Sequence, residues 1–105
     1  TSFNQPANLE EDQAMISASK NNDSLKLQKL LGSPRDPSVT DKEGNAPLHH
    51  AASKGNLLNV QLLLEAGAHK DAQAENKLTP LLCATKFKRL EVVRLLIRAG
   101  ADKNL

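Results

Sequence analysis

Three histidines and one cysteine are the residues of this sequence best suited to bind a metal or to act as nucleophiles: His49, His50, His69 and Cys83. A zinc site normally needs ligands at helical or Cys-x-x-Cys spacing. The sequence has no histidine pair four residues apart and no second cysteine. We therefore expect no metal site and no cofactor.

Cys83 and His50 occupy equivalent positions in a sequence repeat, and such a pair can act as a nucleophile and its base when it lies on adjacent stacked helices. No third group that would orient the base is evident, so we interpret Cys83 as a packed, inert thiol. A single cysteine also excludes an internal disulfide and suits a reducing compartment. We expect an intracellular protein, cytoplasmic or nuclear, that is not an enzyme.

Charged clusters give no stronger sign of chemistry. We interpret the acidic run at 10–12 as favourable charge at the N-terminus of the first helix. Lys86, Lys88 and Arg89 lie beside Phe87, and alternating basic and aromatic residues can bind nucleic acid. With two aromatic residues and a net charge of +2, we do not expect nucleic acid as a partner. Binding of acidic or nucleic-acid ligands by this basic segment stays open as an alternative function.

The elements that position these residues are expected to be helices. Apolar residues make up 39% of the 105 residues. Most of them are leucine and alanine, with few β-branched residues, which favours helices over a β-sandwich. No apolar run reaches the roughly 18 residues of a transmembrane helix, so we expect no membrane contact. The first residues do not resemble a signal peptide and include no initiator methionine. We expect a monomeric fragment of a longer protein.

An internal repeat with one fixed period organises the chain. The segment 46–52 matches 79–85, and Leu63 falls on Leu96 at the same offset without a gap. A weaker copy precedes them, as expected of a terminal repeat with one side facing water. Leu→Ala at either matched leucine is expected to cost about 2–5 kcal/mol.

Each copy is expected to form two short helices that stack on those of the next copy. Pro47 and Pro80 suit a first helical turn, and the Thr79 hydroxyl can cap the helix that follows it, whereas Ala46 cannot. Small residues at 18, 51, 52 and 84 allow close helix packing. The expected helices span about 10–21, 24–32, 47–54, 57–66, 80–87 and 90–99, with turns near 36–45 and 69–78 projecting to one side.

The pattern Asp-x-x-Gly-x-Ala/Thr-Pro-Leu-His, followed by Ala-Ala-x-x-Gly, Val-x-x-Leu-Leu and Gly-Ala, resembles the ankyrin repeat. The resemblance covers 41–105 almost continuously and about 8–40 weakly. It implies an all-α helical solenoid of three helix-turn-helix repeats, the first a degenerate N-terminal cap. The expected divisions are an N-terminal arm at 1–8 and repeats at 9–40, 41–73 and 74–105.

The resemblance also implies roles for individual residues. His49 is expected to tie neighbouring turns together by hydrogen bonds. In the third copy Lys77 and Lys88 replace glycines of the pattern, and Leu82 replaces its histidine. A lysine at a positive-φ position costs about 1 kcal/mol, so we expect a distorted turn near Lys77.

For function, the resemblance implies a non-catalytic protein–protein interaction module, or scaffold. It would bind a partner protein through its turn tips and the concave face of the first helices. A targeting domain of a larger enzyme stays open as an alternative. The candidate partner-binding residues, mapped by position, are Lys42, Glu43, Asn45, Ser53, Lys54, Glu75, Asn76, Leu78, Lys86 and Phe87, with Leu9, Glu10, Lys20 and Asn21 from the first copy.

Two of these candidates, Leu78 and Phe87, are apolar at positions that the repeat core does not need. We expect them to form an apolar anchor for the partner; the alternative is that Phe87 packs on a further repeat. The charges along the binding face are expected to change from acidic in the first copy to basic in the third.

Overall fold

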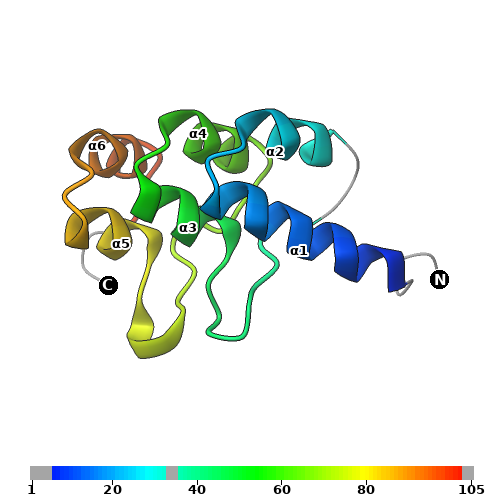
Figure 1. The fold of residues 1–105 in the computed structure, drawn as a ribbon. Helices are drawn as coiled ribbons and strands as arrows, with labels where there is room; N and C mark the ends of the chain where they lie inside the picture. Colours follow the sequence, from blue (N-terminus) through cyan, green and yellow to red (C-terminus); the bar gives the residue numbers. More distant parts are fainter. Residues whose placement is uncertain (1–5, 33–35, 103–105) are drawn as a thin grey trace.

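The computed structural model describes residues 6–32 and 36–102, and in these residues all the regular secondary structure is helical, without strands (Figure 1). The first two pairs are α1 (Pro6–Lys20) with α2 (Ser24–Leu31) and α3 (Pro47–Lys54) with α4 (Leu57–Glu65). A 3-10 turn, η2 (Glu75–Lys77), precedes α5 (Pro80–Lys86) and α6 (Leu90–Arg98). The prediction of an all-α helical solenoid is confirmed. Residues 1–5 of the expected arm lie outside the described residues.

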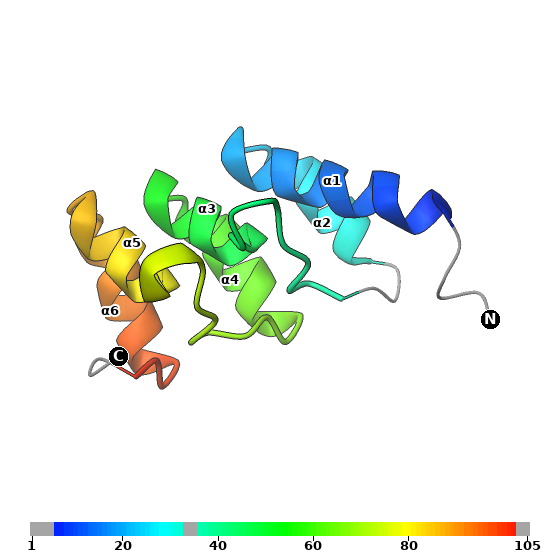
Figure 2. The same cartoon turned by 90° about the horizontal axis from the view of Figure 1, so that it is seen from below.

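The helices form two layers (Figure 1). Helices α1, α3 and α5 lie side by side in the inner layer, and α2, α4 and α6 form the outer layer. Figure 2 shows the three pairs following one another along the molecule. The segments 36–46 and 69–79 leave the layers on the same side, as the sequence predicted.

Helix α1 begins at Pro6, earlier than the predicted start near residue 10. A proline is well suited to a first helical turn, because its missing N–H would have no partner there. The first turn of α1 therefore contains no acidic residue. The acidic run at 10–12 lies one turn further on, so its interpretation as charge at the helix N-terminus was wrong.

Local capping follows the sequence closely. The Thr79 hydroxyl accepts a hydrogen bond from the Leu82 N–H at 3.2 Å, whereas Ala46 has no side-chain cap. Gly44 and Gly67 have φ values of 80° and 90°. Both therefore adopt the left-handed conformation that a glycine takes without steric cost.

The turn before α5 is distorted, as predicted. Lys77 is one cause of the distortion, and Ala74 is a second. Asn76 and Lys77 have φ values of 60° and 59°. In the preceding copy the Asp41 carboxylate accepts hydrogen bonds from the N–H groups of Glu43 and Asn45. Ala74 occupies the position of Asp41 and cannot accept these bonds, so the two turns differ in shape.

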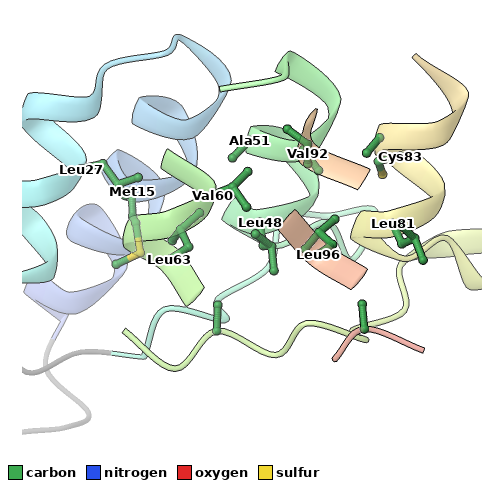
Figure 3. Close-up of a cluster of buried hydrophobic side chains, with 14 of the residues drawn as sticks. Met15, Leu27, Leu48, Ala51, Val60, Leu63, Leu81, Cys83, Val92 and Leu96 are labelled. Carbon is green, nitrogen blue, oxygen red and sulfur yellow. The ribbon is translucent and has the colours of Figure 1, made fainter. Parts of the chain in front are cut away.

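The core is one continuous row of aliphatic side chains between the layers. It runs from Met15 and Leu27 at one end to Leu81 and Cys83 at the other (Figure 3). The alanines expected to allow close packing, at 18, 51, 52 and 84, are all buried.

One buried side chain contradicts this apolar pattern. Asn59 is fully buried, and neither its amide nitrogen nor its amide oxygen has a hydrogen-bond partner. One repeat later the equivalent position is Val92, which is also buried. A buried amide without partners destabilises the fold, because its hydrogen bonds to water are lost on folding.

Leu63→Ala is expected to lower the free energy of unfolding by about 2–5 kcal/mol, because it opens a cavity in the middle repeat. Leu63 is fully buried, whereas Leu58 on the same helix is 52% exposed. Leu58→Ala is therefore the matched control. Urea unfolding followed by circular dichroism measures both, and equal losses would show that residue 63 is not a core position.

Asn59→Val is expected to stabilise the protein by about 1–3 kcal/mol, because it removes a buried amide without partners. The reciprocal change Val92→Asn is expected to destabilise by a similar amount. Denaturant midpoints compared at an unchanged slope measure both effects. A loss of stability in Asn59→Val would mean that the amide makes bonds in solution.

Candidate functional site

His49 connects three segments of backbone. Its Nδ1 accepts a hydrogen bond from the Ala46 N–H at 3.0 Å, so the ring proton lies on Nε2. Nε2–H then points at the carbonyl oxygens of Ala72 and Leu78, at 3.0 and 2.9 Å. The predicted role of His49 as a tie between neighbouring turns is confirmed.

The imidazole of His49 is held neutral. Burial lowers its pKa below the usual 6.5, although the bonds to the Leu78 and Ala72 carbonyls act in the opposite direction. Protonation would also place a hydrogen on Nδ1, facing the Ala46 N–H. The neutral form is therefore part of the folded arrangement.

Further hydrogen bonds join successive turns at a fixed offset. The Ser38 hydroxyl accepts from the His69 N–H at 3.0 Å, and one repeat later the Asp71 carboxylate accepts from the Asp102 N–H at 2.7 Å. Sequence reasoning missed this pair of contacts. The equivalent positions of Ser38 and Asp71, both short side chains with an acceptor oxygen, are the signal that could have indicated it.

His50 takes part in a different contact, with the turn of its own repeat. Its Nε2 lies 2.9 Å from Oδ2 of Asp41. Although burial raises the pKa of Asp41, its hydrogen bonds with the Asn45 N–H and with His50 hold the pKa below the usual 3.8. The pair thus supports the turn that carries Lys42.

Cys83 lies in the core, where burial raises the pKa of its thiol. Because the thiolate is the reactive form, this environment favours the inert interpretation. Within 6–32 and 36–102, no group of three or more His, Cys, Asp or Glu side chains is arranged to hold a metal ion. In the same residues no helix has the length and apolar character needed to cross a membrane.

An open groove of about 650 Å³ lies between α1 and the turn that follows the first repeat. Asp12, Ile16 and Lys20 line it from α1, and Val39 and Lys42 line it from the turn. It therefore combines aliphatic side chains with charges of both signs, and it includes two of the predicted binding residues, Lys20 and Lys42.

The predicted binding residues divide between the two ends of the inner helices, because α3 and α5 each begin beside a turn tip and end beside an outer helix. Lys42, Glu43, Asn45, Glu75, Asn76 and Leu78 belong to the turns that project from the layers, and Ser53, Lys54, Lys86 and Phe87 lie at the opposite ends. The Glu75 N–H donates to the Glu43 carbonyl at 3.1 Å, which joins the two tips directly. Glu10, Lys20 and Asn21 are exposed; the Leu9 side chain lies outside the described part of the chain.

The structure does not bring together Leu78 and Phe87, the two residues of the predicted apolar anchor. Leu78 is partly buried and packs against the core cluster, so the repeat does use this position. Leu78 precedes α5 and Phe87 follows it, which separates them by a seven-residue helix, about 10 Å long. Phe87 is 50% exposed, and the Lys86 ammonium lies 5.6 Å from the centre of its ring.

Comparison with known proteins identifies a repeat family. A family model described as ankyrin repeats, in three copies, matches residues 14–105. A putative ankyrin repeat protein of Coxiella burnetii is 42% identical over 63% of this chain and 20% of its own length. The B-cell lymphoma 3 protein homolog of Mus musculus is 42% identical over 64% of this chain and 15% of its length. Ankyrin repeat domain-containing protein 39 of Homo sapiens is 37% identical over 59% of this chain and 34% of its own length. The chain therefore spans only a minor part of these relatives.

The neutral state of His49 predicts a pH dependence. In the unfolded chain His49 binds a proton below about pH 6.5, whereas in the folded protein its lowered pKa disfavours protonation. The contribution of neutral His49 to the free energy of unfolding is therefore present above that pH and is lost as the pH falls. His49→Gln is expected to lower stability near pH 7.5 but to reduce this loss between roughly pH 7 and 5. Urea unfolding across that range measures it. Parallel profiles for the two proteins would show that His49 titrates normally in the fold.

Proposed function

Because the chain belongs to the ankyrin-repeat family, whose repeats generally mediate protein–protein interaction without catalysis, we propose that it binds a partner protein through its turn tips and the concave face of the inner helices. The residues proposed to contact the partner there are Lys42, Glu43, Asn45, Glu75 and Asn76. Lys42, Glu43, Glu75 and Asn76 are exposed, and Asn45 is partly so.

The groove beside Lys42 is the observation that carries this proposal. Protein interfaces combine an apolar centre with a polar, hydrated rim. Ile16 and Val39 offer aliphatic surface in the groove, and Lys20 and Lys42 offer charge beside it. A segment of a partner protein with one apolar side chain and neighbouring charges fits this combination.

The turn tips are suited to recognition because they are held rigidly. The backbone bond from Glu75 to Glu43 and the His49 bonds to Ala72 and Leu78 fix one turn against the next. A preformed surface loses less conformational entropy on binding than a mobile loop does. The tips therefore present Lys42 and Asn76 in a constant arrangement.

Ser17 is an exposed residue of α1 that also lines the groove. A photo-crosslinking residue introduced at Ser17 or Lys42 is expected to capture the partner in cell extract. The same residue at Gln61 on α4, an exposed position in the outer layer, is expected to capture little. With the captured partner in hand, Val39→Ser is expected to weaken binding by about tenfold, because apolar contacts at the centre of an interface carry most of the energy. Lys42→Glu is expected mainly to slow association. Capture from position 61 alone would move the interface to the outer face.

A further inference from the structure

The turns that join inner to outer helices form a second surface, at the end of the helices away from the turn tips. We call this surface the inter-helix edge and define it as residues 20–23, 53–56 and 86–89. Because α1 contacts α3 and α3 contacts α5, the three turns follow one another along the molecule. Packed helices lie about 8–10 Å apart, so the edge is a row of three neighbouring turns.

Basic residues are concentrated on the inter-helix edge. It contains five basic residues and one acidic residue, whereas the remainder of the chain contains nine basic and eleven acidic ones. The turns at 36–45 and 69–78 contain five acidic and three basic residues. Although the net charge of the chain is small, basic residues thus predominate on the edge at one end of the helices, and acidic residues predominate at the turn tips at the other end.

The lysines of the edge are available to a partner. Lys20, Lys54, Lys86 and Lys88 are exposed, and in the described residues none of them forms an ion pair with a carboxylate. Arg89, by contrast, is committed to the fold, because its Nε–H donates to the Ser53 carbonyl at 2.9 Å. That bond joins the second and third turns of the edge.

A small apolar hollow lies within this basic surface. It has a volume of about 200 Å³ and is lined by Leu57, Leu90 and Val92, together with Gly55, Arg89 and Glu91. Leu57 and Leu90 are 40% and 64% exposed. Phe87, two residues before the lining residue Arg89, is 50% exposed. Glu91, the acidic residue of the lining, is paired with Arg94 at 2.7 Å.

We propose that the inter-helix edge binds an acidic segment of a partner protein, with one aliphatic side chain of that segment seated between Leu57 and Leu90. Its carboxylates would lie against Lys54, Lys86 and Lys88. Charge complementarity favours an acidic ligand, and the aliphatic hollow favours a peptide over nucleic acid, whose bases need aromatic stacking partners. The edge offers a single aromatic ring, Phe87.

Apart from Lys20, which also lines the groove beside Lys42, this surface is made of other residues, and the inference does not depend on the proposed function. The edge lies beyond the C-terminal ends of α1, α3 and α5, whereas the turn tips lie before the N-terminal ends of α3 and α5. A module with both surfaces could hold two protein segments at once.

The proposal is tested with a fluorescein-labelled peptide that contains two leucines within a run of aspartate and glutamate. Fluorescence anisotropy measures its binding. The wild-type chain is expected to bind it, and binding is expected to weaken as salt rises. The double variant Lys54→Glu, Lys86→Glu is expected to lower affinity by about tenfold or more. Leu90→Ser, which leaves the charges unchanged, is expected to lower it by about tenfold. Circular dichroism of each variant confirms that the helices are retained.

Matched controls separate this surface from the groove. Lys29→Glu on α2 and Lys42→Glu at the turn tip are exposed charge reversals outside the edge, and both are expected to leave peptide affinity within about twofold of wild type. A peptide with serine in place of leucine is expected to bind less tightly. The proposal is overturned if the acidic peptide does not bind or if the control reversals weaken it equally. It is also overturned if single-stranded DNA or phosphatidylserine vesicles bind the edge more tightly than the peptide.

Discussion

Inner helices can lie next to one another only as closely as the side chains between them allow, and in this chain the limiting side chains are alanines. Ala18, Ala51 and Ala84 recur once in every repeat and are all buried. A methyl group at each of these places leaves room for α1 to pack on α3 and for α3 to pack on α5. Since helices of eight or nine residues are not stable alone, their packing depends on this spacing.

Hydrogen bonds complete the stacking where the apolar core ends. The turns carry many backbone polar groups, which must find partners when they are removed from water. His49 supplies three such bonds, and the Ser38 and Asp71 side chains supply one each to the next turn. Leu82 occupies the position of His49 in the third copy and cannot repeat its bonds. The turn tips of the second and third repeats are therefore held against each other by side chains whose role is structural.

The antiparallel course of each helix pair also divides the surface. Every repeat returns its chain to the side from which it began, so all turn tips gather at one end and all inter-helix turns at the other. Charges that look evenly mixed along the sequence thereby become a basic edge and acidic-leaning tips. The tips and groove, on one side, and the edge with its hollow, on the other, differ in both charge and apolar content. The two proposed surfaces therefore present different chemistry to a protein segment.

The sequence by itself determined the features that repeat. The fixed period located the helices to within one or two residues, except at the start of α1, and matched positions identified Leu63 and Leu96. The resemblance to the ankyrin repeat indicated the tie made by His49. Contacts that occur once were decided by the tertiary structure: the His50–Asp41 pair, the bond from Arg89 to Ser53, and the burial of Asn59 without partners. The packing of Leu78 and its separation from Phe87 belong to the same group. A repeat pattern reports which positions share an environment, whereas a single contact depends on the direction of side chains from different repeats, which only the folded chain fixes.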